Sequence, residues 1–168
     1  INAMDNNALG TPDYKTKFEF LKKASDLYST VSETYSYTSK LKNEMSGLRS
    51  ELMRTASGTH ELMNRTRDIE NQLDAIILAL SGRRTEGARV DATEPSVMNR
   101  MRFAVSATSY TESDITGAQK EQLRIGRSKF ENQYNKLENL HDNMLVNLEN
   151  DLEALGIDWA AGRLPMFK

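Results

Sequence analysis

Apolar residues recur along the first third of the chain at steps of three and four. The series runs from Tyr14 to Leu52, and its average step of about 3.5 residues is typical of a helix that packs against other helices. Thr38 fills its only gap. The members are Tyr14, Phe18, Leu21, Ala24, Tyr28, Val31, Tyr35, Leu41, Met45, Leu48 and Leu52. The pattern predicts one helix over Pro12–Arg54, on the order of 60 Å long at 1.5 Å per residue.

The middle of this segment is rich in hydroxyl side chains, which lower helix propensity because they compete for backbone hydrogen bonds. They are Ser29, Thr30, Ser32, Thr34, Ser36, Thr38 and Ser39. The apolar period continues through them without a change of register. We therefore expect a helix here, with room for a bend.

A break in the period separates the first helix from a second one. The segment TASGTHE contains Gly58, which suits a left-handed C-terminal cap, and Thr59, which can begin the next helix. The second helix has one stripe along its length and ends at Ser81-Gly82. The stripe consists of Leu62, Thr66, Ile69, Leu73, Ile76 and Leu80. The segment Gly82–Pro95 has no period and predicts a loop, long for a bundle.

Two further helices are predicted in the second half of the chain. The shorter one covers Glu94–Ser109 and the longer one covers Thr116–Leu155. Thr116 and Gln119 fit the capping box of a helix start, with Asp114 adding favourable charge, so the polar cluster before them predicts a corner. The stripe positions are Val97, Met101, Val105 and Thr108, then Leu123, Phe130, Tyr134, Leu137, Met144, Leu148, Leu152 and Leu155.

The four predicted helices indicate an all-α fold, namely an antiparallel up-down helical bundle with two long helices and two shorter ones. We expect a single domain over residues 1–168. Residues 1–10 are polar and begin with a sequence like a vector remnant, so they are expected to be disordered or vector-derived. Gly156 should close the last helix. The apolar tail, residues 157–168, is expected to fold back onto the ends of the bundle.

Composition narrows the classes of function. The 168 residues include no cysteine, which excludes disulfides, thiolate catalysis and cysteine-bound zinc. The net charge is −2, with acidic and basic residues interspersed, so nucleic acid is not an expected partner. The longest wholly apolar run, Ala75–Leu80, is far too short to span a membrane, and no signal peptide is present.

The two histidines predict no metal site. His60 and His141 are far apart in sequence and neither belongs to an H-x-x-x-H pair. Their acidic neighbours, Glu61 and Asp142, are expected to point to other faces of a helix. We interpret His141 as a polar residue that is hydrogen-bonded within the bundle.

Catalytic groups are equally scarce. Glu149 and Glu153 form a carboxylate pair of the kind that glycoside hydrolysis uses, but an exposed helix face accounts for them more simply. We therefore expect a non-enzymatic chain with no catalytic, cofactor-binding or metal residues. The residues predicted to contact a partner or ligand are Trp159, the only tryptophan, and the basic doublet Arg83-Arg84 in the long loop. Lys22-Lys23 is the only other basic doublet.

The second half of the chain resembles a known family. Residues 97–123, VMNRMRFAVSATSYTESDITGAQKEQL, are similar to a segment that follows sortilin-like (VPS10-like, BNR-repeat) β-propellers in bacterial proteins labelled glycosyl hydrolases. The matching positions there are Asn99, Arg100, Met101, Ser113, Asp114, Thr116, Gln119 and Glu121. Ile115 stands where the family usually has proline. The family's closing pattern is matched by Leu145, Leu148, Glu149, Leu152, Gly156 and Ile157, so the resemblance covers Met98–Ile157.

The resemblance implies a non-catalytic, C-terminal helical accessory or interaction domain of a larger exported protein, secreted or located in the periplasm or cell envelope. Its partners would be other domains of the parent chain, a β-propeller and an immunoglobulin-like sandwich, or another protein. The glycosidase label belongs to the propeller, and no catalytic residue of the family maps onto this chain. Two alternatives stay open: a homodimeric coiled-coil scaffold in which the long helices pair with a second copy, and a fragment of a carbohydrate-active enzyme that uses Glu149 and Glu153.

Overall fold

The computed structural model describes residues 14–54, 60–82, 94–109 and 114–167, with the side chains of residues 107–109 excepted. The helical elements are α1 (Tyr14–Leu52), α2 (His60–Ser81), α3 (Val97–Ser109), α4 (Gly117–Leu140), a π-helical turn η1 (His141–Leu145) and α5 (Val146–Ala154). The described residues contain no strand. The predicted all-α fold is confirmed.

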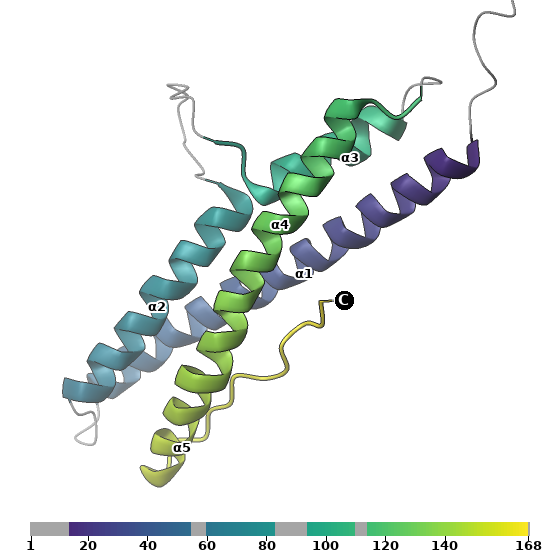
Figure 1. Ribbon diagram of the computed structural model, residues 1–168. Helices are drawn as coiled ribbons and strands as arrows, with labels where there is room; N and C mark the ends of the chain where they lie inside the picture. The colour runs from purple at the N-terminus through teal and green to yellow at the C-terminus, as the bar shows by residue number, and fades with distance from the viewer. Residues whose placement is uncertain (1–13, 55–59, 83–93, 110–113, 168) are drawn as a thin grey trace, which may run out of the picture.

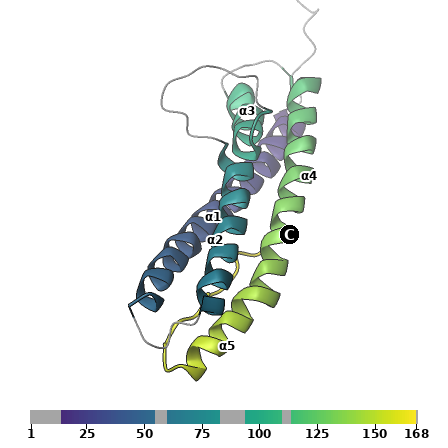
Figure 2. The ribbon, with the colours of Figure 1, turned by 90° about the vertical axis from the view of Figure 1, so that its left-hand side faces the viewer.

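The helices pack around α1, which is the longest element (Figure 1). α2 runs antiparallel to the C-terminal half of α1 and α3 runs antiparallel to its N-terminal half, so that α2 and α3 follow each other end to end (Figure 2). α4, η1 and α5 form one long rod that returns beside them. The bundle thus has the two long and two shorter helices that the sequence predicts.

The buried face of α1 agrees with most of the predicted stripe but is shifted in its middle. The buried residues are Ala24, Leu27, Val31, Thr34, Thr38, Leu41, Met45, Leu48 and Leu52. Leu27 and Thr34 are buried where the pattern assigned Tyr28 and Tyr35, which are only partly buried at the edge of the core. The helix places the neighbouring, smaller side chains at the centre because the tyrosine rings reach the same core from its margin.

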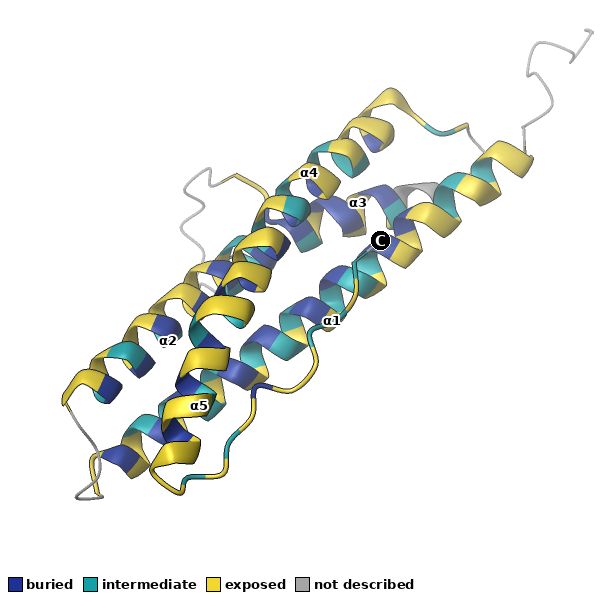
Figure 3. Ribbon diagram, turned by 60° about the horizontal axis from the view of Figure 1, so that its bottom comes forward, coloured by how far each residue is buried: buried dark blue, intermediate teal, exposed yellow. Residues whose placement is uncertain are grey.

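The N-terminal turns of α1 carry exposed aromatic side chains. Tyr14 and Phe18 are 71% and 68% exposed, so their assignment to the core was wrong. The spacing correctly predicted an apolar face on the helix. At this end, however, none of the described elements covers that face, so it is exposed to solvent (Figure 3). Pro12, where the helix was expected to begin, lies outside the described residues, and the other end is reached at Leu52, two residues before Arg54.

The hydroxyl-rich middle of α1 is continuous helix, as expected. Thr34 and Thr38 are fully buried, and their hydroxyls donate to the carbonyl oxygens of Thr30 and Thr34 at 2.8 and 2.7 Å. Each bond reaches back one turn of the helix. Both buried hydroxyls therefore have a hydrogen-bond acceptor while the backbone stays helical.

The prediction for α2 is confirmed at every stripe position. All six predicted residues are buried, and the helix ends at Ser81. Gly82 follows with φ of 80° and donates its N–H to the carbonyl of Leu78 at 2.8 Å. Gly58 and Thr59, expected to form the preceding turn, lie outside the described residues.

The third helix begins at Val97, three residues later than predicted. Ser96 caps it, because its hydroxyl accepts a hydrogen bond from the backbone N–H of Asn99 at 3.3 Å. Glu94 is instead an ion-pair partner of Arg100, at 3.0 Å. The Arg100 side chain is only 7% exposed and also donates to Gln122 on α4 at 2.6 Å. This network holds the start of α3 against α4.

Close packing joins α3 to α4. Val97 and Met101 are buried as predicted, Val105 is partly buried, and the side chain of Thr108 lies outside the described part. Gly126 of α4 faces Met101 so closely that a Cβ built on it would lie 1.9 Å from the methionine methyl carbon. A larger residue at this position would require the end of the Met101 side chain to move.

The predicted capping box at the start of α4 is present. The Thr116 hydroxyl accepts from the Gln119 backbone N–H at 3.3 Å, and the Gln119 side-chain oxygen accepts from the Thr116 backbone N–H at 2.6 Å. Asp114 lies just before it and is exposed. The residues before Asp114 that were assigned to the corner, 110–113, lie outside the described part.

The π-helical turn η1 interrupts the helix predicted over Thr116–Leu155. A π turn holds one residue more than an α turn, so the buried positions step from Leu140 to Leu145. Met144, assigned to the core, is therefore only partly buried, and Leu155 is 40% exposed. The remaining predicted positions from Phe130 to Leu152 are buried.

Residues 157–167 form an extended segment that we call the C-terminal strap. Gly156, with φ of 77°, closes α5, and its N–H and that of Ile157 donate to the carbonyls of Glu153 and Leu152. The strap then runs back along the side of the bundle between α1 and α4, rather than over its ends (Figures 1 and 3). Its apolar side chains pack against the core. The tail was expected over the ends of the bundle, whereas the strap lies along its side.

Candidate functional site

Of the residues predicted to contact a partner, only Trp159 lies in the described part of the chain. Arg83 and Arg84 lie outside the described residues. Trp159 is part of the strap and packs partly buried against the core. Its indole Nε1 is buried and has no hydrogen-bond partner in the described part of the chain. This tryptophan is therefore chiefly an anchor of the strap.

The structure does place Trp159 beside the carboxylate pair of α5. Glu149, Glu153 and Trp159 line a shallow hollow of about 410 Å³. The two carboxylates stand one helical turn apart on the same face, whereas glycoside hydrolysis needs carboxyl groups on either side of the bond that is cleaved. The hollow thus has an aromatic residue close to the acids but lacks the facing geometry of a hydrolase.

The histidines occupy different surroundings. His60 is the exposed first residue of α2. His141 is partly buried between the helix and the strap, with Nδ1 at 3.0 Å from a carboxylate oxygen of Asp142 and Nε2 at 3.1 Å from the carbonyl of Gly162. The expectation that Asp142 would face away was wrong, because the two adjacent side chains contact each other in the π turn. The described residues hold no group of three potential metal ligands.

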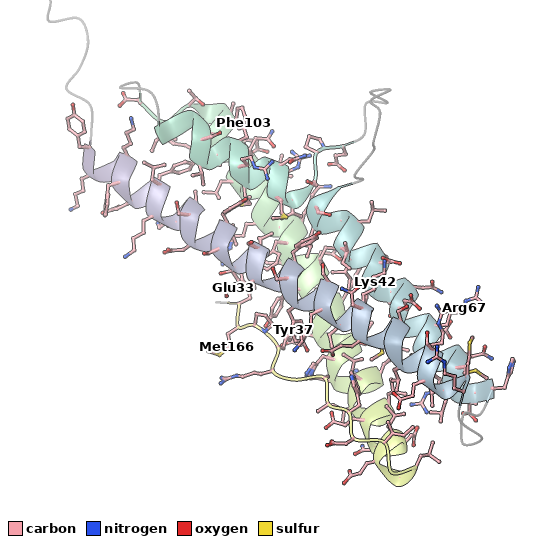
Figure 4. All side chains as sticks on the ribbon, turned by 180° about the vertical axis from the view of Figure 1, so that it is seen from behind. Glu33, Tyr37, Lys42, Arg67, Phe103 and Met166 are labelled. Atoms are coloured by element: carbon pink, nitrogen blue, oxygen red, sulfur yellow. The ribbon has the colours of Figure 1, made fainter. Side chains whose placement is uncertain are left out.

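A groove that the sequence analysis missed lies between the N-terminal halves of α1 and α4 and the end of the strap. It measures about 650 Å³. Its apolar lining comes from all three elements and consists of Phe20, Leu27, Leu123, Met166 and Phe167. Met166 is 64% exposed, so part of this lining is in solvent. Figure 4 places Met166 on the side of the molecule where Tyr37 of α1 meets the strap. We call this feature the basic groove, because of the charges on its rim.

The rim of the basic groove is mostly positive. Lys23 of α1 and Lys120, Arg124 and Arg127 of α4 line it, against one acidic residue, Asp26. Arg124 and Arg127 form ion pairs along α4, whereas the described residues supply no ion-pair partner for the two lysines.

The basic rim had a signal in the sequence. Lys120, Arg124 and Arg127 are spaced four and three residues apart, which puts them on one face of a helix, and Lys23 belongs to the Lys22-Lys23 doublet. The sequence could not predict that α1, α4 and the strap lie around one common groove.

Comparison with protein-family models, curated proteins and solved structures gave no match. No described helix combines the length and the apolar character that crossing a bilayer requires.

A second hollow, between α2 and α4, measures about 850 Å³. Small and amide side chains line most of it, including Ala75, Ala79, Asn132 and Gln133. It offers neither large apolar anchors nor an excess of one charge. The basic groove has both, and it is the stronger candidate for a binding surface.

Proposed function

We propose that this chain is a non-catalytic helical interaction module, and that its basic groove receives an amphipathic, acid-flanked helix of a partner protein. The observation that carries the proposal is the apolar groove with its cationic rim. Large apolar side chains supply the contact area, and the lysines select a partner of opposite charge.

The dimensions of the groove suit a short helix. Its lining on α1 extends from Phe20 to Thr30, which is about 15 Å at 1.5 Å per residue. A partner helix of about ten to fourteen residues would match that length, with large apolar residues at helical spacing facing Leu27 and Leu123. Two walls of the groove are helices, and the strap that forms the third is not part of a described strand, so the groove offers no sheet edge for an extended partner to join.

The wider setting of the module rests on the sequence resemblance over Met98–Ile157 alone. On that basis, the chain is the C-terminal accessory domain of an exported BNR-repeat protein, following a β-propeller and an immunoglobulin-like sandwich. The partner helix would then belong to another domain of that parent or to a second envelope or secreted protein. Reading the genomic coding sequence upstream of Ile1 tests this setting, because a propeller there would support it and a start codon would contradict it.

The test of the groove uses a designed peptide of about fourteen residues, with leucine or phenylalanine along one face and glutamate at both ends, labelled for fluorescence anisotropy. We expect saturable binding that weakens as salt is added. Lys23→Glu combined with Lys120→Glu should weaken it at least about tenfold, since two attractive charges become repulsive.

Two controls make the result specific. Lys22→Glu is the control for Lys23→Glu alone: it changes the net charge by the same two units beside the groove without altering its lining, and should leave the affinity within about twofold of the original. A peptide with lysine in place of glutamate should bind much more weakly. Equal affinity for both peptides, or equal losses from the Lys22 and Lys23 variants, would contradict the proposal.

A further inference from the structure

The C-terminal strap is held through its backbone. The hydroxyl of Tyr37 on α1 donates to the carbonyl of Ala161 at 3.2 Å, and the hydroxyl of Tyr134 on α4 donates to the carbonyl of Pro165 at 2.7 Å. Nε2 of His141 lies 3.1 Å from the carbonyl of Gly162. Three polar side chains from the two sides of the groove thus bond to backbone carbonyl oxygens of the strap. Every residue type has such a carbonyl, so these bonds do not depend on the side chains of the strap.

Apolar side chains of the strap supply the other contacts. Phe167 packs edge-on against Phe130 with ring centroids 4.9 Å apart, lies 5.4 Å from the ring of Tyr134, and has the guanidinium of Arg127 5.3 Å from its own centroid. The strap residues packed into or against the core are Ile157, Trp159, Ala161, Leu164 and Phe167.

The charged side chains of the strap take no part in this binding. Among the described residues, Arg163 contacts only the sulfur of Met166, at 3.9 Å within the strap itself, and Asp158 has no bonded partner on the helices. Recognition therefore depends on carbonyl positions and apolar anchors. Tyrosine-lined grooves commonly bind extended, proline-containing peptides in this way.

The connection to α5 contributes nothing to this recognition. The helix is already closed at Gly156: the N–H groups of Gly156 and Ile157 donate to the carbonyls of Glu153 and Leu152, rather than to the groove. A strap that arrives from another molecule could make the same three hydrogen bonds and fill the same apolar positions. The covalent link supplies only a high local concentration.

We infer that the groove between α1 and α4 is a binding site for an extended apolar peptide, that the chain's own strap occupies it, and that the strap of a second copy is the ligand it also accepts. This inference goes beyond the proposed function, since it concerns another ligand and the contacts of Tyr37, Tyr134 and His141 rather than the lysines of the basic groove, although Met166 and Phe167 of the strap also line that groove. The expected product of exchange is a strap-swapped dimer.

The single tryptophan makes the site measurable. In the full chain carrying Trp159→Phe, the only tryptophan signal comes from an added peptide of residues 156–167. A second full-length protein combines Trp159→Phe with Leu164→Ala and Phe167→Ala, which weakens its own strap. We expect a saturable blue shift of the peptide's emission with this protein, and binding at least about tenfold weaker to the chain with the intact strap, which competes.

Matched peptides test what is recognised. A peptide with Asp158→Asn and Arg163→Gln should bind as well as the original, while one with Leu164→Ala and Phe167→Ala should lose binding at least about tenfold. Loss of affinity from the charge changes alone would overturn the inference, as would the absence of any saturable shift up to millimolar peptide.

Two full-length variants test the second copy as the source of the ligand. The acceptor carries Leu164→Ala and Phe167→Ala, and the donor carries Tyr37→Phe and Tyr134→Phe, which keep the rings but remove two hydrogen bonds to the strap. Mixing them should give a 1:1 dimer in sedimentation, whereas each alone should sediment as a monomer. Monomers in the mixture would overturn exchange between copies. Either result leaves the Lys23 and Lys120 experiment unaffected.

Discussion

At the scale of single residues, the side chains that hold the strap differ in how they respond to pH. Burial, followed by the negative charge of Glu44, raises the pKa of Tyr37 to about 12, so its hydroxyl stays protonated and remains a donor at physiological pH. His141 titrates closer to neutrality. Burial opposes its charged form, but the hydrogen bonds to Asp142 and Gly162 and the charges of Asp142 and Glu149 outweigh burial and raise its pKa.

The pKa of His141 predicts that its tether is strongest in mild acid. The imidazolium donates to Asp142 and to the Gly162 carbonyl at once, whereas the neutral ring can donate to only one of them. A pKa raised on folding adds stability that is complete below the unfolded value near 6.5 and is lost as pH rises through the folded value. We expect His141→Gln to cost about 1 kcal/mol at about pH 5.5 and much less at about pH 8.5.

Urea denaturation of both proteins at the two pH values measures this difference. His60→Gln is the matched control, because His60 is exposed at the start of α2, and it should show no comparable loss in acid. A His141→Gln cost that is constant with pH, or that grows in alkali, would show that the charged imidazole does not hold the strap.

Among the elements, the π turn separates what the sequence could predict from what it could not. The stripe of α2 was predicted completely, because the helix is regular and every step of three or four lies on one face. In α4 and α5 the same reasoning chose Met144 and missed Leu145, since an extra residue in the turn shifts the phase. The site that holds the strap could not be predicted from the sequence either. The apolar spacing counts tyrosine as an apolar residue and does not show which group its hydroxyl will bond to.

Removing the extra residue tests this reading of the element. Deleting exposed Asn143 would leave Leu140 and Leu145 four positions apart, as in a regular α-helix, and keep α5 on the same face. We expect a fully helical protein whose unfolding free energy in urea lies within about 1 kcal/mol of the original.

The control deletion belongs in a regular helix. Deleting exposed Ala75 from α2 would turn Ile76 and Leu80 away from the core by about 100°. That should cost at least about 3 kcal/mol, because two buried aliphatic side chains become exposed. If the Asn143 deletion lowers the unfolding free energy as much as the Ala75 deletion does, the π turn contributes to stability in some way other than by setting which face of α5 is buried.

For the molecule as a whole, α1 is covered unevenly. α2 packs along its C-terminal half, α3 packs along its N-terminal half, and the strap contacts its middle at Tyr37, but the first buried residue is Ala24. This gradient could not be predicted from the sequence, since the apolar spacing is as regular at Tyr14 as at Leu48 and does not reveal which helices pack against each position. The uncovered end is also where a second copy would pair in the coiled-coil alternative.

Amide hydrogen exchange distinguishes these two arrangements along α1. In a monomeric bundle, the amides of Phe18–Lys22 should exchange by local fraying, at least about a hundredfold faster than those of Leu41–Leu48, which open only with global unfolding. Raising the protein concentration should not change that ratio. Protection of Phe18–Lys22 that climbs with concentration would mean that another chain covers Tyr14 and Phe18, and a coiled-coil dimer would then replace the self-contained bundle as the functional unit.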